Sequence, residues 1–240
     1  MNAPDQVIVL AAGKSSQLDG ISKVLIRHPR NCRTILDHVI EAFAGCKITV
    51  VVGFRAIHIM QHYPELHYVH NPDWALTNNA GSLGLALAEL GPKPCYVISG
   101  DIFLERALIE RLNTAAPNMV LTSTREKRAQ SAVHCVTDED GRVLETYQGP
   151  VRSMAHPESV GLFKIGSAPL LRAWQRRCIE HANLFAGQLL PCGEDDAEIT
   201  SVALRDNELF FEVNAPTDYL ELIDTTRLRA AQPMPQAWAA

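Results

Sequence analysis

The chain has 240 residues, of which 47% are hydrophobic, and this is enough to bury the core of one large domain. Its formal net charge of −5 gives no general attraction for nucleic acid or anionic membranes, and no apolar run approaches the roughly 20 residues that span a bilayer. The six cysteines form no CxxC pair and the first residues do not resemble a signal peptide, so we expect a cytoplasmic protein with reduced thiols.

The first half of the chain alternates apolar runs with amphipathic stretches. The apolar runs predict buried strands at residues 7–12, 47–53, 66–70 and 94–99. Helices are expected at 35–43, where Thr34 and Asp37 resemble a capping box, at 55–62, and after Ser82. Strands that alternate with helices predict an α/β fold with a mostly parallel central sheet.

The second half has a different pattern. Strands are predicted at 119–124, 131–137, 142–148 and 159–165, and a helix at 168–179. Residues 199–205 and 208–213 flank Asp206 and Asn207, which predicts a hairpin, and Pro216 is expected to begin a last helix that runs to about residue 229. We expect one domain over residues 1–232 and a flexible tail at 233–240, where Pro233 and Pro235 lie.

Polar residues follow the ends of several of these strands, which is where open α/β sheets bind ligands. The small-residue turn at 11–13 is followed by Lys14 and Lys23, a combination suited to a phosphate group, although it also fits an ordinary loop. Asp101 follows the buried run 94–99 and offers a carboxylate to a hard cation such as Mg²⁺, or it forms a simple turn after Gly100.

Two asparagine-containing segments complete the set of candidate sites. Asn214 lies between a predicted strand and the helix that begins at Pro216, so its side chain binds a metal or caps that helix, and the two roles are compatible. The segment 78–82 (NNAGS) offers side-chain amides, a hydroxyl and free backbone groups at a helix start. These groups are able to hydrogen-bond the edge of a nucleobase, or they cap the helix.

Six motifs in this sequence resemble those of the nucleotidyltransferase superfamily, in the same order. The sequence LAAGKSSQLDGISK (10–23) is similar to the family signature LAAG-x-G-[ST]-R-[LM] followed by a lysine, and Gly100-Asp101 to its metal-binding aspartate. EVNAPTDYLEL (212–222) resembles the C-terminal metal-binding segment, and VVVGF (50–54) and NNAGSLGLAL (78–87) resemble the elements beside the base. SVGLFKI (159–165) is similar to a strand of the choline-phosphate and phosphonate cytidylyltransferases.

The resemblance implies a Rossmann-like, three-layer α/β/α fold of the GT-A-like type with a mixed, mostly parallel sheet. It implies transfer of a nucleotide, with CTP favoured, to a small phosphate- or phosphonate-bearing acceptor, with release of pyrophosphate. Lys23 and Asp101 are the implied catalytic residues, and Asp101 and Asn214 the implied ligands of Mg²⁺. The implied nucleotide-binding residues are Leu10, Ala11, Ala12, Gly13, Lys14, Gly53, Asn79, Gly81 and Ser82.

The acceptor is less well specified by the sequence. Lys164 and Arg152 are candidates for an anionic acceptor group and Glu158 for an acceptor amine or hydroxyl, whereas solvated surface charge is the alternative for the two cations. No partner nucleic acid or membrane is expected, and a homodimer is compatible with the sequence.

The chain departs from the family signature at two positions. Ser15 replaces a glycine, and Gln17 replaces the arginine that binds the triphosphate in the family. The phosphate site therefore lacks one positive charge, unless Lys14, Arg27 or Arg30 supplies it.

One alternative to a cytidylyltransferase is a sugar-1-phosphate or molybdopterin-type nucleotidyltransferase, and the short gap between Gly13 and Lys23 resembles the molybdopterin-type members. The other, which Gln17 suggests, is a relative that binds nucleotide without turning it over.

Overall fold

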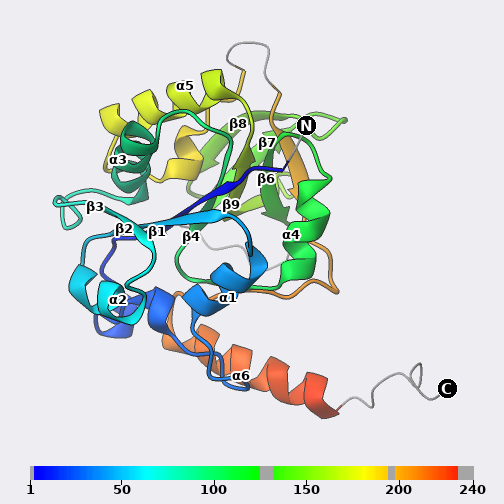
Figure 1. Cartoon of the computed structure of the whole chain (residues 1–240). Helices are drawn as coiled ribbons and strands as arrows, with labels where there is room; N and C mark the ends of the chain where they lie inside the picture. Colours follow the sequence, from blue (N-terminus) through cyan, green and yellow to red (C-terminus); the bar gives the residue numbers. More distant parts are fainter. Residues whose placement is uncertain (1–2, 125–131, 194–197, 232–240) are drawn as a thin grey trace.

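The computed structural model describes residues 3–124, 132–193 and 198–231, and its centre is a nine-stranded mixed sheet (Figure 1). The strands follow the order β10-β6-β9-β4-β1-β2-β3, and β7 pairs with both β8 and β9. Strands β3, β2, β1 and β4 are parallel neighbours, whereas β9 runs antiparallel to β4 and β6. The strands of this sheet are β1 (Gln6–Ala11), β2 (Lys47–Val52), β3 (His67–His70), β4 (Cys95–Ser99), β6 (Asn118–Ser123), β7 (Val133–Thr137), β8 (Val143–Gln148), β9 (Glu158–Ile165) and β10 (Thr200–Ala203).

Helices cover both faces of the sheet, so the predicted three-layer arrangement is confirmed. Successive residues of β1 face opposite layers, as strand geometry requires: Val7 and Val9 pack toward α1, α2 and α4, and Ile8 packs toward α3 and α5. These three side chains are fully buried, which explains why the first strand is an uninterrupted apolar run. The helices are α1 (Ile35–Ala42), α2 (Ala56–His62), α3 (Asn79–Leu90), α4 (Arg106–Asn113), α5 (Ala168–Glu180) and α6 (Pro216–Ala231).

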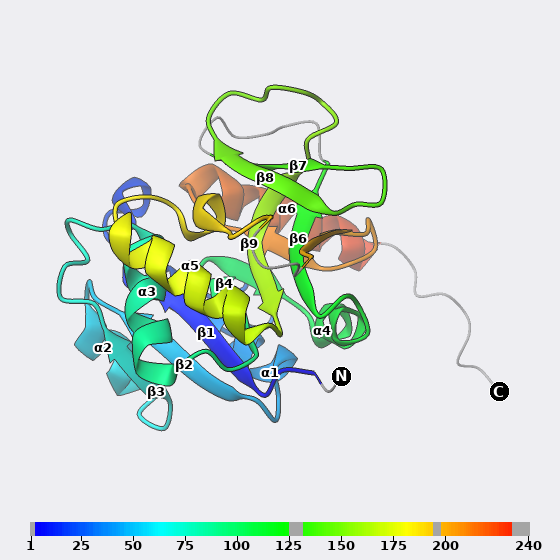
Figure 2. The same cartoon turned by 90° about the horizontal axis from the view of Figure 1, so that it is seen from above.

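The hairpin of β7 and β8 lies at one end of the sheet, beyond β6 and β9 (Figure 2). A second, two-stranded sheet pairs β5 (Ile102–Leu104) with β11 (Phe210–Glu212) in antiparallel fashion. Because β5 follows Asp101 and β11 precedes Asn214, this small sheet brings together two segments that are more than a hundred residues apart in the chain.

One expectation from the sequence is wrong at the level of elements, and two elements are missing from the expectations. The segments around Asp206 and Asn207 do not pair with each other as a hairpin, because β10 pairs in parallel with β6 and β11 pairs with β5. Strand β5 and helix α4 were not predicted at all. The domain end expected at residue 232, the tail at 233–240 and Ser131 of the predicted strand lie outside the described residues.

The described helices do not include one that is both long and apolar enough to cross a membrane.

Candidate active site

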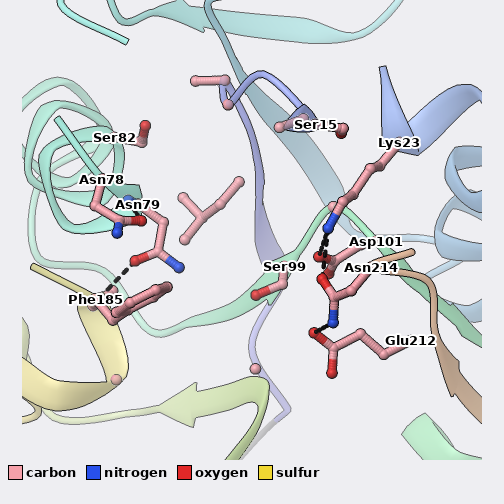
Figure 3. A pocket seen from close by; sticks show the side chains of 18 of the residues that line it. Ser15, Lys23, Asn78, Asn79, Ser82, Ser99, Asp101, Phe185, Glu212 and Asn214 are labelled. Atoms are coloured by element: carbon pink, nitrogen blue, oxygen red, sulfur yellow. Dashed lines mark hydrogen bonds and ion pairs between the residues drawn. The ribbon is translucent and has the colours of Figure 1, made fainter. Parts of the chain in front are cut away.

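A cavity of about 690 Å³ opens at the carboxyl ends of β1 and β4. This is the position at which open α/β sheets bind ligands. Figure 3 shows two groups of side chains facing each other across it, with Ser99 between them. Of the predicted site residues, the cavity is lined by Leu10, Ala11, Ala12, Gly13, Lys14, Lys23, Asn79, Ser82, Asp101, Glu158 and Asn214.

The loop after β1 forms one wall of the cavity and is held by backbone hydrogen bonds, both within the loop and from the end of β2. Phe54 N–H donates to Ala12 O, and Leu18 and Gly20 both donate their N–H groups to Ser15 O. Ser15 has a φ of −74°, a value that any residue adopts, so this loop does not need the glycine that the family signature has there. The replacement of that glycine by Ser15 is therefore compatible with an intact loop.

The cavity has few cationic groups among its described lining residues. Lys14 and Lys23 are the two, and Gln17 is exposed on the same wall. Arg27 donates to Cys32 O outside the cavity lining, and Arg30 is not among the described residues that line it. Arg27 and Arg30 are therefore not placed to supply the positive charge that Gln17 lacks, and Lys14 is.

Lys23 joins the two predicted metal ligands in one hydrogen-bonded group. Its Nζ lies 2.9 Å from Asp101 Oδ2 and 2.6 Å from Asn214 Oδ1, and both side chains are in view beside it in Figure 3. The side chains of Lys23 and Asp101 are 22% and 15% exposed, so their attraction is weakly screened by water. Three residues from distant parts of the sequence thus converge at one point, as the motifs predict.

Gly100 allows this convergence. A Cβ at this position would lie 2.8 Å from Leu10 O and 2.9 Å from Val24 Cγ1, and Gly100 N–H donates to Leu10 O. The end of β4 therefore approaches β1 and the Lys23 segment more closely than any other residue type permits.

Glu212 is a site residue that the sequence analysis did not assign. Its Oε1 accepts a hydrogen bond from Asn214 Nδ2 at 2.7 Å, and it lines the cavity next to Asp101. Burial and then the negative charge of Asp101 raise the pKa of Glu212 well above its usual range. The sequence carried a signal for it, because Glu212 and Asn214 are two residues apart at the end of a strand and so point to the same side.

These side chains fit a hard divalent cation. Asp101 Oδ1 is buried and has no hydrogen-bond partner among the described residues, so one carboxylate oxygen is available for a ligand. The oxygen set of Asp101, Asn214 and Glu212 is the type that Mg²⁺ prefers, which commonly takes one or two carboxylates plus substrate phosphates. The described residues contain no group of three or more His, Cys, Asp or Glu side chains suited to a metal.

The opposite wall of the cavity is the start of α3. Free backbone N–H groups are expected there from the sequence, but these groups are already hydrogen-bonded. The N–H groups of Asn78 and Gly81 donate to Ala182 O, and that of Ala80 donates to Leu184 O. The side chain of Asn78 caps the helix. The expectation of free backbone groups here is wrong, because the segment after α5 folds over this helix end and uses them. The start of α3 therefore faces the cavity with the side chains of Asn78, Asn79 and Ser82.

Two predicted nucleotide-binding glycines lie behind the cavity instead of lining it. A Cβ on Gly53 would lie 2.5 Å from Trp74 Cβ, and one on Gly81 would lie 2.8 Å from Thr77 Cβ. Neither glycine is among the lining residues. Their positions correct the expectation that they contact the base: each one allows a neighbouring segment to pack closely.

The three candidate acceptor residues are in different places. Glu158 lines the cavity. Lys164 does not: it is 2% exposed, and its ammonium group donates to Leu112 O at 2.5 Å and Ala115 O at 3.1 Å, at the end of α4. Arg152 is also outside the lining, with its guanidinium group bonded to Glu145 and 3.9 Å from the centroid of the Tyr147 ring. The structure thus corrects the prediction that Lys164 and Arg152 contact an acceptor in this cavity.

Comparison with known proteins finds relatives of one kind. The family model for the MobA-like NTP transferase domain matches residues 7–189. A CMP-5'-(3-aminopropyl)phosphonate synthase of Streptomyces rubellomurinus is 31% identical over 187 residues. That match covers 70% of this chain and 28% of the relative, so this chain spans a minor part of the relative's length.

Solved structures of nucleotidyltransferases share the fold. The CTP:phosphocholine cytidylyltransferase from Streptococcus pneumoniae has a TM-score of 0.72 at 18% identity, covering 94% of this chain and 100% of that one. The inositol-1-phosphate CTP transferase from T. maritima has a TM-score of 0.70 at 16% identity, covering 95% and 98% of the two chains. A UDP-glucose pyrophosphorylase has a TM-score of 0.72 at 11% identity, covering 95% and 100%.

Proposed function

The chain belongs to the family of MobA-like NTP transferase domains and is a nucleotidyltransferase, and from this premise we propose that it is a cytidylyltransferase. In this proposal it transfers CMP from CTP to a small phospho-alcohol or phosphonate and releases pyrophosphate. The observation that carries the proposal is the cavity at the ends of β1 and β4, with Lys23, Asp101 and Asn214 on one side and the uncharged start of α3 on the other. The charged side suits phosphate groups and the uncharged side suits a base.

The choice of CTP rests on the relatives. The Streptomyces relative is a CMP-5'-(3-aminopropyl)phosphonate synthase, and two of the similar structures are a CTP:phosphocholine cytidylyltransferase and an inositol-1-phosphate CTP transferase. Because the relative makes a CMP-phosphonate, we assign a phosphonate or phosphate acceptor to this chain as well. The six cysteines are all free, which supports a cytoplasmic location for the enzyme.

The reaction that fits this site needs positioning and charge neutralisation. An oxygen of the acceptor phosphate or phosphonate attacks the α-phosphorus of CTP, and the bond from that phosphorus to the bridging β-phosphate oxygen breaks. The acceptor oxygen is already anionic near neutral pH, so no general base is required. The ammonium group of Lys23 neutralises charge that develops on the α-phosphate and orients the two reactants.

Mg²⁺ is the cofactor of this proposal. Asp101 and Asn214 would hold it, with Glu212 beside them, and when bound it neutralises charge on the phosphate oxygens. Lys23, which bonds both residues, keeps their oxygens facing the cavity. Glu158, on the cavity wall formed by β9, is the residue that we assign to the acceptor.

Pyrophosphate release measures this function directly. Each of CTP, UTP, ATP and GTP is offered with phosphocholine, 2-aminoethylphosphonate or glucose 1-phosphate. We expect release with CTP and one of the first two acceptors. Faster release with UTP and glucose 1-phosphate contradicts the cytidylyltransferase assignment and favours a sugar nucleotidyltransferase, for which the similar UDP-glucose pyrophosphorylase fold is the precedent. Nucleotide binding without release in any combination contradicts an enzymatic role.

A further inference from the structure

Lys14 is a cation of the cavity wall whose ammonium group forms no hydrogen bond or ion pair with the described residues. Lys23, in contrast, is bonded to Asp101 and Asn214. The Lys14 side chain is exposed, and a lysine has a long flexible stem, so its ammonium group samples many directions unless that stem is packed. The groups that the Lys14 stem contacts therefore decide whether its charge stays at the cavity.

The aromatic ring of Phe54 lies beside the Lys14 side chain. Phe54 follows the end of β2, and its N–H group donates to Ala12 O, which ties this residue to the end of β1. Lys14 Nζ lies over the Phe54 ring, 5.9 Å from its centroid. At such a distance the negative face of an aromatic ring attracts a cation. The ring therefore offers the Lys14 ammonium group a resting place that needs no anionic partner.

Gly20 lies against both side chains of this contact. A Cβ on Gly20, whose φ is +71°, would lie 3.2 Å from Phe54 Cζ and 3.5 Å from Lys14 Cε. The backbone of Gly20 is fixed, because its N–H group donates to Ser15 O. The Lys14 stem is therefore packed close to its charged end, against a fixed glycine and beside the Phe54 ring.

The Phe54 ring is itself held by its neighbours. Its centroid lies 5.1 Å from that of the Trp74 ring, with 59° between the two planes, and Trp74 in turn packs closely on Gly53. Phe54 is half-buried and is not among the described residues that line the cavity. An effect of Phe54 on a ligand in the cavity must therefore pass through a residue that does line it, and Lys14 is such a residue.

The loop after β1 has a reason to fix Lys14. Gln17 stands where the family signature has an arginine, so this wall carries one cation fewer. An arginine presents its charge on a rigid planar fork, whereas a lysine needs support from outside its own side chain. We propose that Phe54 is a positioning residue that holds the Lys14 ammonium group toward the triphosphate and so offsets the arginine that Gln17 replaces. This inference rests on the proposed use of a nucleoside triphosphate as substrate.

A double-mutant cycle between Lys14 and Phe54 tests this role. Phe54→Leu keeps an apolar side chain against Trp74 and removes the aromatic face, and Lys14→Met removes the charge and keeps most of the stem. The measurement is the dissociation constant of a nucleoside triphosphate with Mg²⁺, by isothermal titration, for the wild type, both single variants and the double variant. The ligand is whichever of CTP, UTP, ATP and GTP the wild type binds most tightly, so the test does not depend on the choice of CTP.

Arg55→Met is the matched control. The guanidinium carbon of Arg55 lies 5.4 Å from the centroid of the same Phe54 ring, but Arg55 is exposed and is not among the described residues that line the cavity. This control removes a cation from the same ring outside the cavity. It therefore separates the loss of any charge near Phe54 from the loss of the charge that faces the ligand. The thermal midpoint of every variant is recorded as well.

We expect Lys14→Met to weaken binding about tenfold. Phe54→Leu should weaken it about threefold when Lys14 is present and less than about 1.5-fold in the Lys14→Met background, and Arg55→Met should stay within about twofold of the wild type. An equal loss on Phe54→Leu in both backgrounds shows a merely structural role of the ring and overturns the inference, as does no loss at all or a wild type that binds none of the four triphosphates. Because this readout is binding, coupling between Phe54 and Lys14 without pyrophosphate release leaves the inference intact and contradicts the proposed transfer.

Discussion

Lys164 shows how strand geometry decides the role of a single residue. In β9 its neighbour Phe163 lines the cavity, so Lys164 points to the other face of the sheet. There its ammonium group binds carbonyl oxygens at the end of α4, and burial lowers the pKa of the Lys164 side chain. Two adjacent residues of an extended strand do not both face one site, so the position of Phe163 in the cavity wall excludes Lys164 from it.

Replacing Lys164 with methionine should affect folding and not substrate binding. The carbonyl groups of Leu112 and Ala115 lose their donor, so we expect the free energy of unfolding to fall by about 1–3 kcal/mol. Urea denaturation measures this, with Lys93→Met, at an exposed position, as the control. An unchanged stability together with a raised KM for the acceptor would place Lys164 in the site after all.

Gln17 is the residue at which the loop after β1 departs most from the family signature. It is exposed on the cavity wall, and Lys14 and Lys23 are the cations among the described lining residues. Gln17→Arg adds a guanidinium group that is able to bind phosphate oxygens. We expect the KM for CTP to fall roughly threefold to tenfold, with kcat little changed. A steady-state titration of CTP at saturating acceptor checks this, and an unchanged or higher KM shows that the position does not face the triphosphate.

Among the structural elements, those with strong local patterns could be predicted from sequence. The apolar runs gave β1, β2, β3 and β4, and the Thr34–Asp37 capping box marks the start of α1, where both of its hydrogen bonds are present. Strand β5 has three residues and is defined by its pairing with β11, so it has no local signal. Helix α4 did carry one, in the spacing of Leu108 and Leu112.

The pairing of strands was harder to predict than their existence. A turn signal at Asp206 and Asn207 favours a hairpin, yet β10 pairs with β6 and β11 with β5. Strand propensity gives no information about the partner, which is chosen by tertiary packing. The same limit applies to the site: the motifs identified Lys23, Asp101 and Asn214, but not the contact of Glu212 with Asn214 or the covering of α3 by Ala182.

Gly100, at the end of β4 beside the cavity, gives a prediction about how this strand packs against β1. Gly100→Ala would push a methyl group against Leu10 O and Val24, so β4 must shift away from β1. We expect a loss of about 1–3 kcal/mol of stability and a lower kcat, because Asp101 moves with the strand end. Thermal unfolding and pyrophosphate release are the measurements. Gly13→Ala, where a Cβ meets nothing within 4 Å, should keep the wild-type stability.

Over the whole molecule, the free energy of unfolding should depend on pH through carboxylates that are hydrogen-bonded in the folded state. Burial raises the pKa of Glu208, but hydrogen bonds from the Arg111 side chain and Arg205 N–H outweigh it and hold the pKa below its usual value. Asp37 is similar. Burial raises the pKa of its carboxyl, but hydrogen bonds from Thr34 and Tyr63 outweigh this effect, so the pKa lies below its usual value. Both groups bind a proton less readily in the folded chain than in the unfolded chain.

The direction of the pH effect follows from this difference. A carboxylate with a lowered pKa contributes stability that is complete above its unfolded pKa, about 4, and that is lost as the pH falls through its folded pKa. We expect these two groups to make the urea midpoint fall as the pH drops below about 4.5, whereas Glu212, whose pKa is raised, lowers stability in the opposite direction, as the pH rises above about 4.5. Glu208→Gln should be less stable near pH 6 and should show a shallower fall, while Asp206→Asn, at an exposed turn, keeps the wild-type profile.

The central claim is that Lys23, Asp101 and Asn214 form the point at which a nucleotide is transferred. The most direct test is transfer of labelled CMP from α-³²P-CTP to 2-aminoethylphosphonate or phosphocholine in the presence of Mg²⁺, by the wild type, Asp101→Asn and the control Asp206→Asn. We predict a labelled CMP adduct with the wild type and the control, and a rate at least about 100-fold lower with Asp101→Asn. Transfer by Asp101→Asn at the wild-type rate would contradict the account.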